Sequence, residues 1–179
     1  MEDRSRATEC LTLAIAHEAG FESTEGQQAV AEVILNRLRS PSFPKTICDV
    51  VFAGSNRRTG CQFTFTCDGS LSRRLPDRVM IAARSVAEDA LAGRAPSRVP
   101  GATHYHADYV HPYWAPSLVR ITRIGAHIFY HAPGATAPGG SILALADDAV
   151  TPAARTTGRN EVFAPWGLPA NAAVTPPPR

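Results

Sequence analysis

Residues 18–27 of the chain read EAGFESTEGQ, and this short stretch decides how the N-terminal half folds. Before it, residues 7–19 carry apolar side chains at helical spacing, and Gly20 follows as a residue typical of a helix end. Within it, Thr24 and Gln27 form a capping-box pattern that opens a second helix, expected to end near residue 40. The stretch is therefore predicted to connect two helices tightly, with carboxylates on both sides.

The rest of the chain predicts one more long helix and a small amount of β structure. Asp77 is expected to cap a helix that runs to about Ala92, where Gly93 stops it. Residues 41–76 are typical of a loop, and residues 102–105 and 121–130 of short β or mixed segments. This order of elements predicts an α+β fold that is rich in helix.

The composition is that of a globular chain with one compact domain and a tail. The 179 residues are 44% apolar and 19% charged, and no run of about 18 apolar residues predicts a membrane span. The first residues lack the shape of a signal peptide, so we expect either a cytosolic protein or an export signal outside this chain. Because proline, alanine and glycine gather at the C-terminal end, we predict a domain over residues 1–131 and a tail over 132–179.

The charge of the chain argues against nucleic acid as a partner. The formal net charge is only +2, and Lys45 is the single lysine among 18 basic residues. Binding to nucleic acid usually needs basic residues clustered on one face. The pairs Arg57-Arg58 and Arg73-Arg74 are isolated and are expected to be solvated loop charges.

Four cysteines leave the disulfide pattern open. Cys10, Cys48, Cys61 and Cys67 allow three complete pairings. Five β-prone residues separate Cys61 from Cys67, so a bond between them requires a turn or hairpin and would favour an oxidising compartment such as the periplasm. Two buried thiols are the alternative, and a thiol nucleophile that uses one of the later histidines is a third reading.

The chemistry of the chain is expected to rest on carboxylates near the first helix end. Glu18, Glu22 and Glu25 lie within eight residues of one another. A carboxyl works as a general acid near neutral pH when burial raises its pKa, and the apolar neighbours of Glu18 can supply that burial. The alternative is that these glutamates are exposed partners of helix termini.

Histidines and aromatic rings form the second candidate cluster. His104 and His106 would share one strand face, and His127 and His131 would share a helix face. Neither pair has the spacing of a metallopeptidase motif, so we predict no metal site. Residues 104–114 are rich in amphipathic rings, which suit stacking on sugars, although core packing is an alternative for Tyr109 and Trp114.

Taken together, these segments resemble the SleB/CwlJ family of cell wall hydrolases, the spore-cortex-lytic type. The resemblance covers roughly residues 7–131. Two local departures stand out: the chain reads Glu-Ala-Gly-Phe-Glu where the family has Glu-Ala-x-Gly-Glu, and Thr64 replaces the usual serine. The matching blocks follow in order at residues 18–27, 29–37, 43–51, 61–64, 102–106, 112–115 and 124–130.

The resemblance implies a lysozyme-like α+β domain that cleaves the glycan strand of peptidoglycan between N-acetylmuramic acid and N-acetylglucosamine. It implies Glu18 as the catalytic acid, no cofactor, and action in the periplasm or another extracytoplasmic part of the cell envelope. A protein regulator is compatible with it and is not identified by the sequence. The residues expected to bind substrate are Glu22, Gln62, Phe63, Thr64, Tyr105, His106 and Trp114.

A lytic transglycosylase is the favoured activity because it needs a single carboxyl. That carboxyl first protonates the glycosidic oxygen and then, as a carboxylate, takes the proton of the C6 hydroxyl of the sugar. A muramidase-type hydrolase would pair two carboxyls at a defined separation. The sequence also leaves open a Cys–His cell-wall peptidase, with Cys61 or Cys67 as nucleophile, and a noncatalytic peptidoglycan-binding module.

Overall fold

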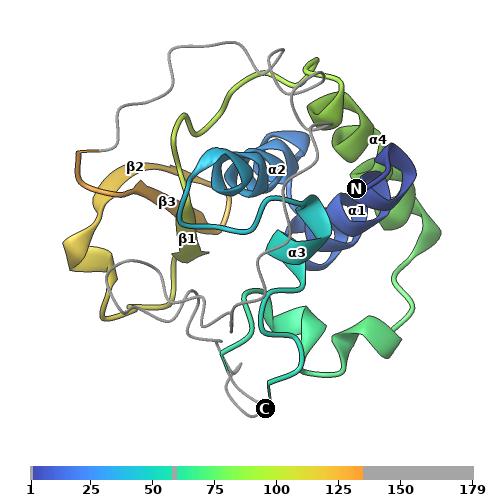
Figure 1. Ribbon diagram of the computed structural model, residues 1–179, viewed down its shortest axis with the longest axis horizontal. Coiled ribbons are helices and arrows are strands. Elements are labelled where there is room, and N and C mark those ends of the chain that lie inside the picture. The colour runs from blue at the N-terminus through green and yellow to red at the C-terminus, as the bar shows by residue number, and fades with distance from the viewer. Residues whose placement is uncertain (1, 58–59, 135–179) are drawn as a thin grey trace.

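The computed structural model describes residues 2–57 and 60–134, which form helices beside a small sheet (Figure 1). Most of the expected tail, residues 135–179, lies outside the described part. No helix of the described part is long and apolar enough to cross a membrane. The helices are α1 (Arg4–Ala19), α2 (Thr24–Arg39), α3 (Ile47–Val51) and α4 (Asp77–Leu91), and the strands are β1 (His104–Ala107), β2 (Val119–Ile124) and β3 (His127–His131). The expected α+β class is confirmed.

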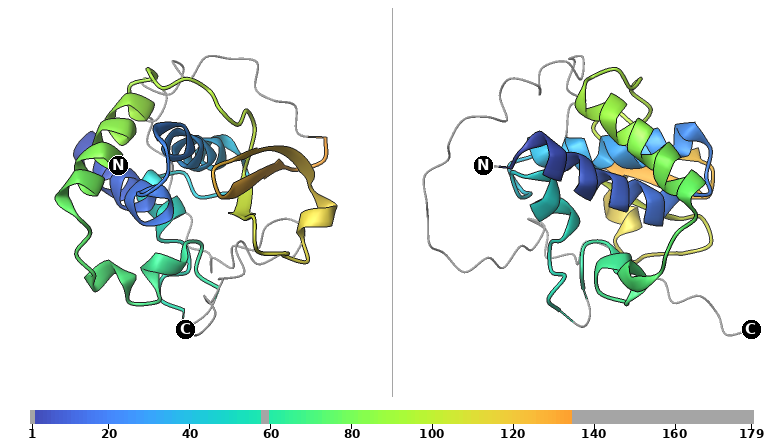
Figure 2. Two further views of the ribbon diagram at one scale, coloured as in Figure 1. Left: turned by 180° about the vertical axis from the view of Figure 1, so that it is seen from behind. Right: turned by 90° about the vertical axis from the view of Figure 1, so that its right-hand side faces the viewer.

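Helix α2 lies between the other long helices and the sheet, so it contributes to both halves of the molecule. Figure 1 shows α1 and α4 on one side of α2 and the strands on the other, and the reverse view of Figure 2 shows the same order. The three long helices pack on one another through aliphatic side chains at helical spacing. Leu11, Ile15, Val30 and Ile34 are completely buried in this contact.

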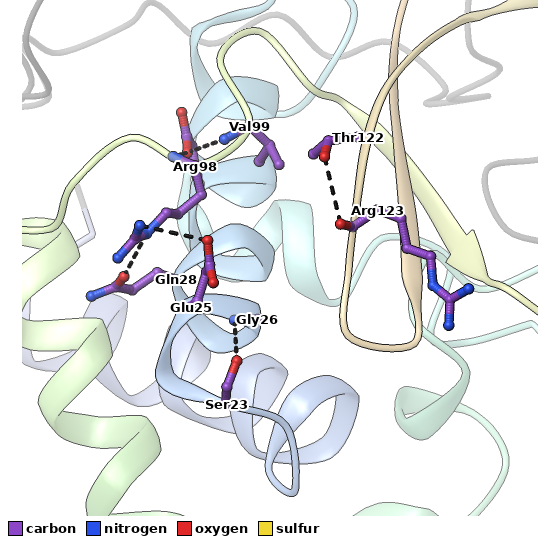
Figure 3. Close-up of polar contacts among 9 residues, drawn as sticks. Ser23, Glu25, Gly26, Gln28, Arg98, Val99, Thr122 and Arg123 are labelled. Carbon is purple, nitrogen blue, oxygen red and sulfur yellow. Dashed lines mark hydrogen bonds and ion pairs between the residues drawn. The ribbon is translucent and has the colours of Figure 1, made fainter.

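The connection between α1 and α2 is tight, as predicted, but two of its details differ. Gly20 ends α1 in a right-handed conformation, and a Cβ there would collide with the Ala16 carbonyl oxygen and a Val79 methyl. Glycine is needed because a Cβ would meet both the backbone of α1 and a side chain of α4. The capping box was wrong: Ser23 is the N-cap, and its hydroxyl accepts a hydrogen bond from the Gly26 amide at 3.3 Å (Figure 3).

Helix α2 also anchors the segment that leads into the sheet. The buried Glu32 carboxylate accepts hydrogen bonds from the amides of Arg98 and Val99, and Asn36 donates to two carbonyls of the same segment. The Arg98 side chain reaches back to Gln28 at 3.0 Å and to Glu25 at 3.6 Å (Figure 3). These contacts fix where β1 begins.

The sheet is antiparallel with the order β1-β3-β2. Tyr105 of β1 pairs with Phe129 of β3, and His106 with Ile128. The expected helical pairing of His127 and His131 was wrong, because both belong to β3 and lie at its two ends. Burial along β3 does not alternate strictly, since the neighbours Phe129 and Tyr130 are both buried, so this central strand is covered on both faces there.

The segment expected to be a loop, residues 41–76, contains α3 and two short 3-10 helices, Thr64–Thr66 and Ser70–Ser72. Cys61 and Cys67 are bonded to each other, but the chain between them turns as a 3-10 helix and not as a β hairpin. A second disulfide joins Cys10 of α1 to Cys48 of α3. Helix α4 starts at Asp77 without side-chain capping, because Pro76 is its N-cap.

Candidate active site

A cavity of about 360 Å³ opens between the C-terminal end of α1, the segment after Cys61 and the strand β1. It falls within the size range of small-molecule sites. Five of the expected site residues line it, and they come from segments far apart in the chain. They are Glu18, Thr64, Tyr105, His106 and Trp114.

Glu18 is one of two carboxyl groups that line this cavity. It lies in the last turn of α1, is half-buried, and accepts a hydrogen bond at 2.8 Å from the Tyr105 hydroxyl. Burial raises the pKa of Glu18 above its ordinary value, against the Tyr105 hydrogen bond and the charge of Arg37, which lower it. A carboxyl with a raised pKa retains its proton closer to neutral pH, as a general acid must.

Tyr105 is held so that it can only donate to Glu18. It is 3% exposed, and its ring packs at 5.1 Å from His127 and 5.6 Å from Phe129. Burial and the negative charge of Glu18 raise the pKa of the Tyr105 phenol well above its usual value. The phenol therefore keeps its proton and fixes Oε2 of Glu18 by donating a hydrogen bond to it.

The far wall of the cavity is a cluster of rings around Trp114. Its ring lies 5.5 Å from that of His104, 5.6 Å from His106 and 5.8 Å from Tyr130. His106 is fixed on both sides: its Nδ1 lies 2.8 Å from the Ala107 carbonyl oxygen and its Nε2 lies 2.9 Å from the Tyr130 hydroxyl. Trp114, only 2% exposed, therefore serves as both a core anchor and a wall.

The near wall is the segment closed by the Cys61–Cys67 disulfide. Thr64 and Phe65 line the cavity there, and Phe65 stacks on His17 at 4.6 Å. Burial lowers the pKa of His17, which favours its neutral form. Asp68 is exposed at this wall, and although burial opposes it, hydrogen bonds with Ser70 and the charge of Arg73 lower its pKa. The cavity thus holds a protonatable carboxyl and an ionised carboxylate.

Three expected site residues do not line the cavity. Phe63 is completely buried, and Gln62 is 6% exposed. With its amide oxygen facing Arg37, Gln62 accepts a hydrogen bond from that guanidinium at 2.9 Å. The Glu22 carboxylate accepts a hydrogen bond from the Ala126 amide at 3.2 Å and thereby supports the turn between β2 and β3.

Arg37 and Asp68 were not among the expected site residues, and His127 was expected only as one of two histidines on a helix face. His127 lines the cavity, and burial lowers its pKa. No sequence pattern marked Asp68 as a site residue, because it simply follows Cys67 in a segment expected to be a loop. Arg37 did have one, since it stands at helical spacing from Val30, Val33 and Ile34 on the apolar face of α2.

Metal and thiol chemistry find less support in the geometry. His104 and His106 do share a strand face against Trp114, but His104 is buried with its Nδ1 2.9 Å from the Thr103 hydroxyl, and both ring nitrogens of His106 have polar partners. In the described ranges, the one group with metal-ligand spacing is Glu2, Cys10 and Cys48, whose two sulfurs are bonded to each other. Cys61 and Cys67 likewise form a disulfide, so neither presents a thiol nucleophile.

Comparison with known proteins places the chain in a family. The cell wall hydrolase model matches residues 21–130. Spore cortex-lytic enzymes of Halalkalibacterium halodurans and Bacillus subtilis are 42% identical over 117 residues and 36% identical over 119 residues. These matches cover 65% and 66% of this chain but only 32% and 35% of the relatives, so the chain spans about a third of their length.

Solved structures agree with this match. The catalytic domain of the germination-specific lytic transglycosylase SleB of Bacillus anthracis superposes with a TM-score of 0.54 at 28% identity, over 72% of this chain and 96% of that domain. The catalytic domain of Bacillus cereus SleB gives a TM-score of 0.53 at 28% identity, over 72% and 92%. The chain belongs to the cell wall hydrolase family and has the fold of the SleB catalytic domain.

Proposed function

We propose that the protein is a peptidoglycan lytic transglycosylase that cleaves between N-acetylmuramic acid and N-acetylglucosamine, with Glu18 as its catalytic acid. The observation that carries this proposal is the half-buried Glu18 carboxyl in the cavity, with its pKa raised by burial and one oxygen fixed by Tyr105. The B. anthracis relative is named as a lytic transglycosylase, which supports the same chemistry.

One carboxyl is enough for the proposed reaction. Glu18 donates its proton to the glycosidic oxygen, the bond to the anomeric carbon breaks, and the released sugar leaves with a new hydroxyl. The carboxylate then accepts the proton of the C6 hydroxyl while that oxygen bonds to the anomeric carbon. The product carries a 1,6-anhydro ring, and Glu18 is protonated again for the next cycle.

The remaining cavity residues would orient the sugar beside Glu18. Thr64 and His106 offer polar groups, and Tyr105 and Trp114 form the adjoining walls. Tyr109 lines the same cavity with 68% of its surface exposed, which suits stacking on a sugar face. Gln62, Phe63 and Glu22 would act from behind this layer, because they touch Arg37 or the β2–β3 turn.

A muramidase-type hydrolase is the second candidate, and Asp68 is the observation that favours it. Asp68 is an ionised carboxylate in the same cavity as Glu18. Glycoside hydrolases pair such a carboxylate with a protonated one, as nucleophile or as base for water. In the transglycosylase reaction Asp68 is dispensable, so Asp68→Asn should retain most activity there and lose most activity in a hydrolase.

The setting of the reaction follows from its substrate. Peptidoglycan lies outside the cytoplasmic membrane, so the protein would act in the periplasm or elsewhere in the envelope. Two disulfides among the described residues fit an oxidising compartment. We assign this activity to residues 1–131 and treat residues 132–179 as an appended tail, with any protein regulator still to be found.

Digestion of purified sacculi followed by mass spectrometry tests both candidates. A transglycosylase releases anhydro-muramyl ends, and a hydrolase releases reducing ends that are heavier by one water. Glu18→Gln should lower the rate by about 10²-fold or more, because it removes the proton donor and nearly preserves volume. Glu25→Gln is the matched control: it removes an exposed carboxylate that pairs with Arg98, and should leave the rate unchanged. A Glu18→Gln variant within a few-fold of the parent contradicts the proposal.

A further inference from the structure

Arg73 and Arg74 are neighbours in the chain but face different parts of the molecule. Both are exposed, as expected for loop charges. Arg74 forms an ion pair at 3.4 Å with Asp77, the first residue of α4. Arg73 instead lines the cavity that contains Glu18. Of these two charges, only that of Arg73 is presented to a ligand in the cavity.

The backbone around Arg73 is held in place by local hydrogen bonds. The amide of Arg73 donates to the Ser70 carbonyl oxygen at 3.0 Å, at the end of a short 3-10 helix. The Ser70 amide in turn donates to the Asp68 carboxylate at 2.7 Å. The Ser72 hydroxyl donates to the Gly69 carbonyl oxygen at 2.7 Å. The exposed guanidinium therefore extends from a wall of defined shape.

Arg73 supplies the only lysine or arginine charge among the described residues that line the cavity. The other formal charges there belong to the carboxyl groups of Glu18 and Asp68. Five ion pairs within 4 Å occur in the described part of the chain, and none involves Arg73. Asp68 interacts electrostatically with Arg73, but its carboxylate already accepts the hydrogen bond from the Ser70 amide. The guanidinium is therefore available to an anion that enters the cavity.

The anionic groups of an unmodified glycan strand of peptidoglycan lie on muramic acid. The sugar rings themselves present hydroxyl and acetamido groups, which are uncharged. Carboxylates occur on the lactyl group at C3 of muramic acid, either as the free acid or on the peptide stem that the lactyl group carries. Glu18 is proposed to act on the bond at C1 of the same ring, so this substituent enters the site together with the bond to be cleaved.

Resting on the proposed function, we propose that Arg73 is a specificity-determining residue that binds a carboxylate attached to muramic acid. The planar guanidinium can bind a carboxylate through two parallel hydrogen bonds, a geometry that a lysine ammonium does not offer. The cavity then favours strands whose muramic acid bears a negative charge over strands in which that charge is absent. Arg73 acts on substrate binding, and Glu18 alone carries the proton transfer.

Binding of soluble glycan strands to the full chain with Glu18→Gln tests this role apart from cleavage. The strands are used with their carboxylates intact and after carbodiimide coupling of those carboxylates to methylamine, which makes them neutral amides. Intact strands should bind about fivefold more tightly at low salt, the upper end of what an exposed ion pair contributes. The preference should weaken as salt is added, because counterions screen exposed charges.

Variants at the two neighbouring arginines assign the preference to one side chain. Arg73→Gln should bring the ratio of the two dissociation constants close to unity. Arg73→Lys should retain part of the preference, since it keeps the charge without the planar fork. Arg74→Gln is the matched control, because it removes the adjacent exposed charge that pairs with Asp77 and should leave the ratio as it was.

Amidase treatment of the strands identifies which carboxylate is bound. Removal of the peptide stems leaves the lactyl carboxylate as a free acid. If stripped strands keep the preference over their own methylamides, and it still depends on Arg73, the ligand is the lactyl carboxylate. If the preference is confined to strands with stems, the ligand is a stem carboxylate. Both results support the proposal.

The outcomes separate the role of Arg73 from the proposed function. Equal binding of intact and neutralised strands overturns the role of Arg73, even where sacculus digestion depends on Glu18. A preference that survives in Arg73→Gln, or that Arg74→Gln abolishes equally, overturns it too. A preference that depends on Arg73 in a protein whose Glu18→Gln form digests sacculi at the parent rate overturns the proposed function and leaves Arg73 as part of a peptidoglycan-binding surface. Digestion that depends on Glu18, with a preference that depends on Arg73, supports both.

Discussion

The helical half of the molecule and its sheet half are packed by different means. Helices α1, α2 and α4 meet through aliphatic side chains such as Leu11, Ile15 and Ile34, which are completely buried and make no directional contact. The sheet half buries rings that also carry polar atoms, and His106 and Tyr130 are both stacked and hydrogen-bonded. The first kind of packing contributes stability, and the second fixes the positions of particular atoms.

Glu18 lies where the two halves meet, and this explains its chemistry. Its backbone belongs to the last turn of α1, so the helical half determines where it starts. Its carboxyl is held by Tyr105 of the sheet, so the other half determines where it points. Substitutions in the helical half should therefore lower stability and leave the rate per folded molecule unchanged. Substitutions around the carboxyl should change the rate and lower stability only slightly.

The largest expected effect on stability lies in the helical half. Ile15→Ala should lower the free energy of unfolding by about 4 kcal/mol, since it removes a completely buried aliphatic side chain. The rate per folded molecule should stay within a factor of two of the parent, because Ile15 does not line the cavity. Denaturant unfolding with activity assays in the folded range gives both numbers. A rate that falls further than the folded fraction would show that the two halves are not separable.

The two disulfides contribute different amounts to stability, and their effects divide along the same line. Cys10 and Cys48 are 38 residues apart, so replacing both by serine should cost about 4 kcal/mol and spare activity. Cys61 and Cys67 are only six residues apart, and their replacement should cost about 2 kcal/mol. That second pair closes the segment that holds Thr64 and ends next to Asp68, and both residues line the cavity. Its loss should therefore also lower the rate per folded molecule. Equal losses of activity in both variants would contradict the division.

The smallest expected effect on stability comes from Tyr105→Phe, about 1 kcal/mol for one lost hydrogen bond. That bond favours ionised Glu18, so its loss should raise the pKa of Glu18 further and move the alkaline limb of kcat/KM to higher pH. Because the folded pKa of Glu18 already exceeds its unfolded value, its contribution to stability is full below the unfolded pKa and is lost as pH rises through the folded one.

The pH dependence of unfolding checks the sign of this effect. In Tyr105→Phe the loss of stability with rising pH should be larger than in the parent and should extend to higher pH. Thr66→Val serves as the control, because it removes a hydroxyl that donates to the Phe63 carbonyl oxygen and not to Glu18. The alkaline limb of its kcat/KM profile should stay unchanged. A limb that moves to lower pH in Tyr105→Phe would mean that the phenol does not stabilise the carboxylate.

The difference between the helical half and the sheet half also explains what could be predicted from the sequence. The three long helices followed from the spacing of apolar residues, because packing of aliphatic side chains imposes that period. Glu18, Tyr105 and His106 could be named through the family resemblance, and the structure brings them to one cavity. The spacing of Cys61 and Cys67 required a chain reversal but could not distinguish a 3-10 turn from a hairpin.

The expected site residues that do not line the cavity have partners remote in sequence. Glu22 lies 104 residues from Ala126, and Gln62, which precedes the 3-10 helix Thr64–Thr66, faces the guanidinium of Arg37 on helix α2. Local patterns carry no information about such contacts. Arg37 is a different case. Its position on the apolar face of α2 could be predicted from the spacing, but nothing in the local sequence indicated that a charged side chain would be completely buried there.

The turn between β2 and β3 carries a constraint for anyone who redesigns this protein. Gly125 adopts a left-handed conformation with φ +57°, and a Cβ at that position would overlap the Glu22 carboxylate. The side chains allowed at positions 22 and 125 therefore depend on each other. A library that varies position 125 alone should return mostly glycine, because a side chain there is strained by the positive φ and also meets the Glu22 carboxylate. Shortening position 22 in the same clone removes the second obstacle and leaves the first. Because that turn leads straight into His127 of the cavity, the paired positions are a way to reshape the site from outside it.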